Sequence, residues 1–315
     1  MEAPLDILGL GAVAVDDLLY LDQFPQADSK MPVQRRERRA GGNTGTALVA
    51  ARRMGRACDY AGSLDETDTL SRFIISAFEA EGVSVRHLAR RPGTRPIHST
   101  ILMDTSAGTR TILFDAQNAV GADPELPAEA VIRSARVLLV DHVGISGTTR
   151  AARIAREARI PIVADLERDQ GDLFRELLAL GDHLILPYDF AQSITGARNG
   201  PEIVRALWRA DRAAVVVTRG AEGSWYLTAE EPGVVYHQPG FRVQEVDTNG
   251  CGDVFHGVYA AGLSEGMSAE VRIRFASAVA ALKAMRQGGQ TAIPMRAGAD
   301  RFFMEKAGQA PRARA

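Results

Sequence analysis

The stretch RVLLV at residues 136–140 is the first of four short apolar runs that decide the fold class. All four are rich in Val, Ile, Leu or Ala, which is typical of strands buried on both faces of a sheet; they are Arg136–Val140, Ile160–Ala164, His183–Leu186 and Ala213–Thr218. Helical periodicity characterises the segments between them, which are Thr149–Ala158, Asp172–Leu180 and Glu202–Ala210. Strands that alternate with helices predict βαβ units around a mainly parallel sheet, with ligands outside the carboxyl ends of the strands.

The first third of the chain has a different pattern. After an apolar strand at Asp6–Leu10, four segments alternate apolar and polar residues, as half-exposed antiparallel strands do; they are Asp17–Leu21, Val33–Arg39, His98–Met103 and Thr109–Phe114. Helical stretches at Gly45–Met54 and Leu70–Ala80 lie between them. We therefore expect a single α/β domain over residues 1–306, with a small β-sheet lid drawn from about residues 14–39 and 97–115. Residues 307–315 have the composition of a disordered tail.

Composition narrows the possible classes of protein. Lys plus Arg is 37 and Asp plus Glu is 39, so the formal charge of the 315 residues is −2. We expect neither nucleic acid nor a membrane as a partner, because such a chain has no global field that favours them. The two cysteines, Cys58 and Cys251, cannot form a disulfide scaffold or a thiolate metal cage. No apolar run approaches the roughly 18 residues of a spanning helix, and the first residues lack the basic start of a signal peptide; we expect a cytoplasmic protein.

The strongest motif is Asp247-Thr248-Asn249-Gly250-Cys251-Gly252-Asp253, which precedes an apolar, helix-compatible segment. Two glycines allow a tight turn that points successive N–H groups into one concavity, and the dipole of the following helix adds positive potential. This pattern predicts an anion hole. Asp253 falls in the first helical turn, where its carboxylate can accept a proton from a hydroxyl brought to a phosphate. The competing interpretation is structural, with Asp253 as a helix cap.

These motifs resemble the PfkB family of carbohydrate kinases, the ribokinase-like sugar and nucleoside kinases. Residues 247–253 match the family's C-terminal signature DTxGAGD, with Cys251 in place of alanine. Gly41-Gly42-Asn43 and the Ala-rich segment after it are similar to the N-terminal signature, and Val217–Gly223 is similar to the TxGxxG nucleotide loop. The resemblance extends to about Pro294 and implies a ribokinase-like, three-layer α/β/α fold with a β-sheet lid.

The resemblance also implies roles for individual residues. Asp253 is the expected catalytic base, and the phosphoryl group is expected to bind the amides of Asn249, Gly250, Cys251 and Gly252. The residues expected around the sugar are Asp16, Gly41, Gly42, Asn43 and Thr46. Those expected around ATP are Thr218, Gly220, Gly223 and Asn249. ATP and Mg²⁺ are the implied cofactors, and a requirement for K⁺ stays open.

Two departures from the family pattern bear on the site. Pro187–Phe190 stands where members often have NxxE, before the Ile194–Gly196 anchor. The metal ligands therefore stay unassigned, although Asp189 or Asp165 could act on Mg²⁺ through water. Thr46 replaces the usual asparagine, and its shorter side chain changes which sugar oxygen can be held.

One subgroup of the family, with ketohexokinase-like and sulfofructose-kinase-like proteins, is most similar to this chain. The likeness lies in Asp253–Gly257 and in the segment from Arg274 to Gly289, together with the two departures. A sulfosugar would be expected to meet an arginine after the strand that ends at Val140. Asp141–Gly144 contains none, which argues against that substrate.

Three further side chains have uncertain roles in the sequence. Lys30 follows Phe24-Pro25 at the expected edge of the lid, where it either contacts an anionic or hydroxyl-rich substrate or is a solvated surface lysine. His256 shares a helical face with Asp253 and either approaches the site or packs in the core. Cys251 stands at a helix start, which predicts a lowered thiol pKa.

The sequence thus predicts an ATP-dependent kinase that phosphorylates a sugar hydroxyl. A nucleoside kinase is the alternative enzyme, and an aromatic stacking partner near the sugar would favour it; Tyr20, Phe24 and Phe114 are the candidates. A non-catalytic sugar or nucleotide sensor on the same fold is the alternative from another class.

The lid also predicts an assembly. A small sheet with one apolar face is rarely left exposed. We therefore expect two lids to pair in a homodimer. The residues expected to become partly buried are Leu19, Leu21, Ile101 and Met103.

Overall fold

A nine-stranded sheet forms the centre of the protein, of which the computed structural model describes residues 5–306, 308, 309 and 312–315. Its order is β15-β14-β13-β12-β11-β10-β9-β1-β4. These strands are β1 (Ile7–Leu10), β4 (Cys58–Tyr60), β9 (Val137–Asp141), β10 (Ile162–Asp165), β11 (His183–Pro187), β12 (Ala214–Thr218), β13 (Ser224–Thr228), β14 (Tyr236–Gln238) and β15 (Ala313–Arg314). The strands from β4 to β12 pair in parallel, and β13, β14 and β15 add an antiparallel edge.

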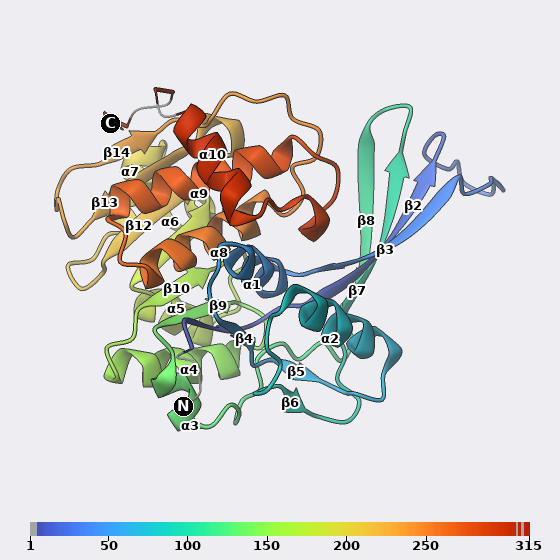
Figure 1. Ribbon diagram of the computed structural model, residues 1–315, viewed down its shortest axis with the longest axis horizontal. Helices are drawn as coiled ribbons and strands as arrows, with labels where there is room; N and C mark the ends of the chain where they lie inside the picture. Colours follow the sequence, from blue (N-terminus) through green and yellow to red (C-terminus); the bar gives the residue numbers. More distant parts are fainter. Residues whose placement is uncertain (1–4, 307, 310–311) are drawn as a thin grey trace.

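Helices cover both faces of this sheet (Figure 1). One layer contains α1 (Asn43–Arg53), α2 (Thr69–Glu81), α8 (Cys251–Ser264), α9 (Ala269–Ala284) and α10 (Arg296–Glu305). The other contains α3 (Glu129–Ser134), α4 (Ile145–Glu157), α5 (Asp172–Leu180), α6 (Tyr188–Thr195) and α7 (Gly200–Leu207). The three layers confirm the predicted α/β fold class. Within the described ranges, no helix has both the length and the apolar character needed to cross a membrane.

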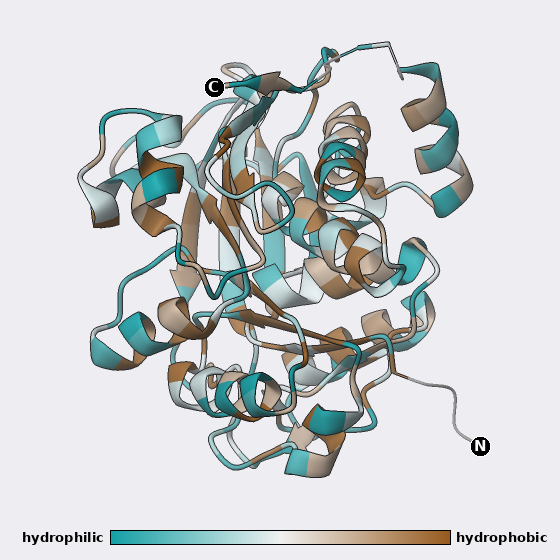
Figure 2. Ribbon diagram, turned by 90° about the vertical axis from the view of Figure 1, so that its left-hand side faces the viewer, coloured by the Kyte–Doolittle hydropathy of each residue, from teal (hydrophilic) through white to brown (hydrophobic). Residues whose placement is uncertain are grey.

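The alternation of side chains along each strand explains why the strand sequences are apolar throughout. In β9, Val137 and Leu139 enter the core formed with α1, α8 and α9. Leu138 and Val140 enter the opposite core, formed with α4, α5 and α7. Both faces are therefore buried. Figure 2 shows these strands in brown between helices that are teal on part of their surface.

A separate four-stranded sheet, which we call the lid sheet, projects from the rest of the protein, which we call the body (Figure 1). Its strands are β3 (Arg35–Gly41), β2 (Ala14–Leu21), β7 (Ile97–Asp104) and β8 (Thr109–Asp115), in that order. The expectation of antiparallel pairing is wrong for the central pair, because β2 and β7 run parallel. Both strands leave the body side by side, joined at their start by the hydrogen bond from Ile97 N to Val13 O (3.0 Å).

The register of the lid sheet gives it two different faces. Leu18 lies opposite Ile101, and their face packs as a small apolar cluster that Met103 joins. Leu19 and Leu21 are one residue out of phase with Leu18, so their side chains point to the opposite face. The four residues expected in a lid interface are therefore divided between the two faces, and a single flat contact cannot contain all of them.

A completely buried carboxylate joins the lid sheet to the body. Asp141, at the end of β9, accepts hydrogen bonds from Ala12 N, the Thr44 hydroxyl and Val143 N, each at 2.7 Å. A side chain at Gly11, whose φ is 149°, would overlap this carboxylate. The end of β1, the start of α1 and the turn after β9 are thus fixed to one side chain.

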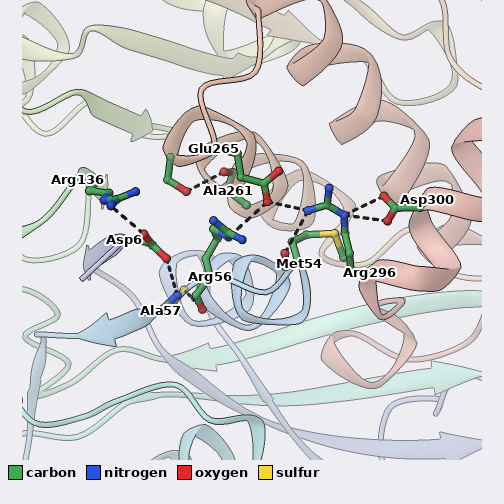
Figure 3. Close-up of polar contacts among 11 residues, drawn as sticks. Asp6, Met54, Arg56, Ala57, Arg136, Ala261, Glu265, Arg296 and Asp300 are labelled. Atoms are coloured by element: carbon green, nitrogen blue, oxygen red, sulfur yellow. Dashed lines mark hydrogen bonds and ion pairs between the residues drawn. The ribbon is translucent and has the colours of Figure 1, made fainter. Parts of the chain in front are cut away.

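A network of ion pairs attaches the last helix, α10, to residues that follow α1 and α8 (Figure 3). Glu265, which follows α8, contacts both Arg56 (3.4 Å) and Arg296 (2.7 Å). Arg296 also binds Asp300 one turn along α10 (2.8 Å). Shorter elements complete the chain: β5 (Ser63–Leu64) and β6 (Ala89–Arg90) pair in a two-stranded sheet, and 3₁₀ turns occur at Gly220–Glu222 and Gln290–Ala292.

The end of the chain differs from the disordered tail expected for residues 307–315. Ala313–Arg314 form β15 and pair with β14. The Arg312 guanidinium stacks 4.1 Å from the Tyr236 ring centre and forms ion pairs with Glu231 and Glu270. These side-chain contacts give a short polar segment the partners that its composition alone did not reveal. Residues 307, 310 and 311 lie outside the described residues.

Candidate active site

The start of α8 forms the centre of the candidate site. Gly250, the residue before the helix, has a φ of 77°, in the left-handed region that favours glycine. No side chain caps the helix there. Cys251 N donates to Thr248 O (3.2 Å) and Asn249 N donates to Asp247 Oδ1 (2.9 Å), so Gly250 and Gly252 supply the amides of the predicted anion hole that have no partner among the described residues. Asp253 lies in the first turn and makes no capping bond among the described residues.

A first cavity, of about 190 Å³, lies between the lid sheet and the body. The lid sheet contributes Asp16, Leu18, Arg39, Ala40, Gly41, Ser99, Ile101 and Ile112 to its wall. The body contributes Gly42, Asn43, Thr46, Asn249, Gly250, Asp253 and Gly289. Carboxylate, amide and hydroxyl groups thus face a small space, as recognition of a polyhydroxylated molecule requires.

A second cavity, of about 370 Å³, lies entirely in the body. One side is formed by residues from the end of β12 to the start of β13 and by residues that follow β14: Thr218, Gly220, Ala221, Gly223, Ser224, Gly240, Phe241, Val243 and Glu245. The other side is formed by the start of α8 and by α9: Thr248, Cys251, Gly252, Phe255, Ser277, Ala280, Ala281 and Ala284. This cavity is larger and more apolar than the first.

The residues predicted from the sequence fall mostly on these two walls. The five residues expected around the sugar, other than Lys30, all line the first cavity: Asp16, Gly41, Gly42, Asn43 and Thr46. Thr218, Gly220 and Gly223 line the second cavity. Asn249, expected on the nucleotide side, lines the first cavity instead. Lys30 is exposed between β2 and β3 and lines neither cavity.

Asp253 is partly buried and lies beside the buried carboxylate of Asp165. Burial raises its pKa well above the usual range, and the negative charges of Asp165 and Glu167 raise the pKa further. Burial also raises the pKa of Asp165, whose Oδ2 accepts a hydrogen bond from Asn43 Nδ2 (3.3 Å). A carboxylate with a raised pKa holds a proton more strongly, so Asp253 is a better base than an exposed aspartate.

Asp16 extends from β2 into the first cavity. A Cβ atom at Gly41 would come within 2.8 Å of its Oδ2, so the glycine leaves room for this carboxylate. Burial raises the pKa of Asp16, and a hydrogen bond with Ser99 opposes that shift. A carboxylate in this setting can accept hydrogen bonds from ligand hydroxyls.

Gly223 and Gly220, which line the second cavity, are glycine for different structural reasons. Gly223 has a φ of 93°, and a Cβ atom there would overlap the Gln238 carbonyl. Its substitution would therefore disturb the fold, whether or not a ligand is bound. Gly220 has a φ of 50° and no atom within 4 Å of its Cβ position, and the same space is free at Gly252, so a ligand could approach the backbone at both glycines.

The protein alone does not form a complete metal cage. Among the described residues, no three His, Cys, Asp or Glu side chains are placed to hold a metal ion together. Asp189 is exposed on α6 and lines neither cavity. Asp165 is the acidic residue of the two named from the sequence that lies beside Asp253.

Two side chains of α8 pack into the body. His256 is buried, with its Nδ1 2.8 Å from Gly252 O and its Nε2 3.0 Å from Ile185 O. Its Nε2 also lies 3.5 Å from Asp165 Oδ1, so this side chain both packs in the body and approaches the acidic group of the site. The expectation of a lowered Cys251 pKa is wrong, because burial raises the pKa of this thiol to about 11. Its Sγ lies against α9, 3.5 Å from Ala280 O, and desolvation there outweighs the helix dipole.

Sequence reasoning missed the contribution of α9 to the second cavity. Ser277, Ala280, Ala281 and Ala284 follow the spacing i, i+3, i+4, i+7, which places small side chains on one helical face. That spacing is visible in the sequence. What it could not show is that the face borders a cavity rather than another helix.

The aromatic residues proposed as stacking partners do not reach the first cavity. Tyr20, Phe24 and Phe114 are all absent from its lining, and no other aromatic residue of the described chain lines it. Phe24 and Phe114 are about half exposed. The wall therefore lacks the stacking surface expected for a nucleobase.

Comparison with known proteins agrees with this arrangement. Residues 7–296 match a family model described as pfkB family carbohydrate kinase. The chain is 26% identical to a ribokinase of Haemophilus influenzae (91% of this chain, 94% of that one). It is 30% identical to an ATP-dependent ribose-1-phosphate kinase of Halopiger xanaduensis (91% and 94%). The fold is similar to that of Arabidopsis thaliana ribokinase complexed with ribose and ATP, with a TM-score of 0.82 and 22% identity (96% and 99% covered).

We predict that iodoacetamide modifies the native protein slowly at pH 8. A thiol with a pKa of about 11 is ionised about 10²-fold less at that pH than a free cysteine, and burial also raises the pKa of Cys58. Timed alkylation followed by mass spectrometry measures both rates, with guanidinium-unfolded protein as the control. Equal rates for native and unfolded protein would contradict the prediction.

Proposed function

The chain belongs to the pfkB family of carbohydrate kinases, and from this premise we propose how its site divides the work of an ATP-dependent sugar kinase. The sugar binds in the first cavity, ATP binds in the second, and the γ-phosphoryl group crosses the start of α8. Asp253 removes the proton from the attacking hydroxyl.

The observation that carries this proposal is the position of one loop between two cavities. Gly250 and Asp253 line the first cavity, whereas Cys251 and Gly252, their neighbours, line the second. Phosphoryl transfer depends on positioning and on neutralising the charge of the transferring group. Helix-start amides between the two ligands supply both.

On the sugar side, Asp16 and Asn43 hold ligand hydroxyls by hydrogen bonds. The two residues approach from the lid sheet and the body, respectively. Sugar hydroxyls bound from both directions exclude water from Asp253, and water exclusion favours transfer to the sugar over hydrolysis of ATP. The lack of an aromatic wall supports a sugar over a nucleoside.

On the nucleotide side, α9 supplies a flat floor of small side chains. Ala280, Ala281 and Ala284 lie opposite Phe241 and the turn at Gly220. The adenine base packs against these apolar groups, and the open backbone at Gly220 receives the phosphate-bearing part of the nucleotide.

Mg²⁺ fits the acidic group beside Asp253. Asp165 is buried, and its Oδ1 accepts no hydrogen bond among the described residues. Mg²⁺ usually keeps several waters and binds through one or two carboxylates together with substrate phosphates, so Asp165 is a sufficient protein contact. When bound, the ion neutralises charge on the phosphates of ATP.

The direct test is turnover over a panel of sugars. ADP release, coupled to NADH oxidation, is measured with ketoses, aldoses, sugar 1-phosphates, sugar acids and nucleosides. We expect ATP-dependent turnover of at least one monosaccharide or monosaccharide phosphate and none of the nucleosides. ADP binding without turnover of any compound would instead identify a nucleotide sensor.

We predict that Asp253→Asn lowers kcat by about 10²- to 10⁴-fold, because the amide cannot accept the proton. ATP and sugar affinities should stay within a few-fold. Asp189→Asn is the matched control, since Asp189 also lies in a first helical turn but lines neither cavity. Kinetics on both variants measure the difference, and near-normal turnover of Asp253→Asn would remove Asp253 from the mechanism.

The same variant has an expected effect on stability. The folded pKa of Asp253 is raised, so its ionisation favours the unfolded chain, and the wild type loses stability as the pH rises above the unfolded value of about 4. The advantage of Asp253→Asn in melting temperature should therefore grow between pH 4 and pH 7. A capping role predicts the opposite, a variant less stable than the wild type at pH 7.

We also propose that two copies of the chain pair through the outer face of the lid sheet, by which we mean the face that points away from the first cavity. This face carries Leu19, and Leu113 on the edge strand β8 is 56% exposed there. Pairing of two such sheets would remove these apolar side chains from water.

We predict that Leu113→Asp converts a dimer to a monomer, because it places a charge among the apolar side chains of that face. Met304→Asp is the control: Met304 is 71% exposed on α10, outside the lid sheet. Light scattering after size-exclusion chromatography gives both masses. A wild type that is monomeric at about 10 μM would rule out the lid interface.

A further inference from the structure

A fully buried ammonium group lies directly behind the start of α8. The side chain of Lys283, on α9, is 0% exposed. Its Nζ donates hydrogen bonds to two backbone carbonyls, Asp247 O (3.0 Å) and Asn249 O. Both lie in the loop at residues 247–250, just before α8, which we call the catalytic loop. The carboxylate of Asp247 is 4.0 Å away. The sequence motifs do not include this residue, and the proposed mechanism has given it no task.

Lysine is a rare residue in this chain. Of its 37 basic residues, three are lysines, at positions 30, 283 and 306. Arginine is thus the ordinary cation of the protein, yet a compact ammonium occupies this buried point. A guanidinium is broader and planar, whereas an ammonium is a point charge that can sit between converging carbonyl oxygens.

The two hydrogen bonds determine which way the loop amides point. In a trans peptide the N–H is directed opposite to the C=O. Because Asn249 O faces Lys283, the N–H of Gly250 is turned away from Lys283. Gly250 lines the first cavity, so Lys283 sets the direction of an amide in the wall where the phosphoryl group is transferred.

Other contacts hold the same loop through the carboxylate of Asp247 and through backbone amides. Asp247 accepts hydrogen bonds from Asn249 N and from Gly288 N, both at 2.9 Å. The amides of Val246 and Asp247 donate to Ala284 O, at 2.8 and 3.0 Å. Lys283 therefore lies in a set of bonds that ties the loop to the end of α9, and it supplies the positive charge in that set.

We infer that Lys283 is a positioning residue that takes the place of a dissociable monovalent cation behind the catalytic loop. K⁺ binds proteins through backbone carbonyl oxygens, and here two such oxygens are already bound by a tethered ammonium. The kinase therefore needs no added K⁺ to order the loop. This inference rests on the proposed function, because it assigns a task in phosphoryl transfer.

The test is the response of two enzymes to a series of cations. The wild type should turn over at the same rate, within twofold, in Na⁺, K⁺, NH₄⁺ and tetramethylammonium chlorides of equal ionic strength. Lys283→Met should lower kcat by about 10²-fold, as misplacement of a catalytic amide does. K⁺ and NH₄⁺ should restore a measurable part of that loss, whereas tetramethylammonium, which is too large for the site, should not.

Two further variants separate positioning from folding. Lys306→Met removes a positive charge at the end of α10, outside both cavities, and should behave as the wild type in every salt. Lys283→Gln keeps a neutral hydrogen-bond donor that supports the fold if Lys283→Met fails to fold. It should remain folded, with low kcat, nearly unchanged KM for ATP, and partial rescue by K⁺.

Nucleotide binding distinguishes failure of this inference from failure of the proposed function. ADP affinity, measured by calorimetry with Mg²⁺, should be independent of the cation in the wild type. In Lys283→Met it should be weaker in tetramethylammonium than in K⁺. That pattern supports the role of Lys283 even if no sugar is phosphorylated, in which case the proposed function alone fails.

Three results would overturn the inference. The first is a wild type that K⁺ activates several-fold. The second is a Lys283→Met enzyme with normal kcat. The third is a folded, slow variant that no cation rescues, since a purely structural lysine would give that result.

Discussion

The carboxylate of Asp141 is the constraint on which the rest of the site depends. It is completely buried, and four backbone or hydroxyl donors from three separate segments surround it. The lid strand β2 begins two residues after Ala12, and α1 begins one residue before Thr44. A shift of this one group would therefore move both the wall that carries Asp16 and the helix start that carries Asn43.

Several carboxylates of this site are removed from water, which is unfavourable for their charged forms. Asp141 and Asp165 are buried and Asp253 is partly buried in the wall of the first cavity, and desolvation raises the pKa of each. The chain compensates in different ways: Asp141 accepts several hydrogen bonds, whereas Asp165 accepts one and Asp253 is left without a capping partner. Groups left with few partners are the ones that can respond to a cation or a proton. The structure thus separates a carboxylate that holds the fold from those suited to chemistry.

The fold class could be predicted from the sequence because its signal is local. Strands such as 137–141 carry runs of Val and Leu, and the helical spacing of apolar residues in α5 can be recognised from Asp172–Leu180 alone. The parallel pairing of β2 with β7 could not be predicted, because it depends on how two segments about 80 residues apart leave the body. The same limit applies to the face of each lid strand, which a register of pairs fixes and a single strand does not.

The candidate site was predictable where a glycine or a carboxylate is required by backbone geometry. Gly42 and Gly250 both have a positive φ at the wall of the first cavity, and both belong to short motifs. Lys283 and the thiol of Cys251 were not predictable, because their behaviour depends on burial against α9. The helix-start position of Cys251 indicated an acidic thiol, and desolvation reversed the sign. The burial of a side chain by distant segments cannot be inferred from the residues next to it in the sequence.

The division of the two cavities has a thermodynamic consequence. The first is walled partly by the lid sheet, whereas the second is walled by the body alone. Any change in the angle between lid and body therefore changes the free energy of a ligand in the first cavity and leaves that of a ligand in the second nearly constant. By linkage, the first ligand shifts the population of lid orientations and the second does not. The measured affinity for the first ligand is then its intrinsic affinity scaled by the fraction of molecules whose lid is already closed.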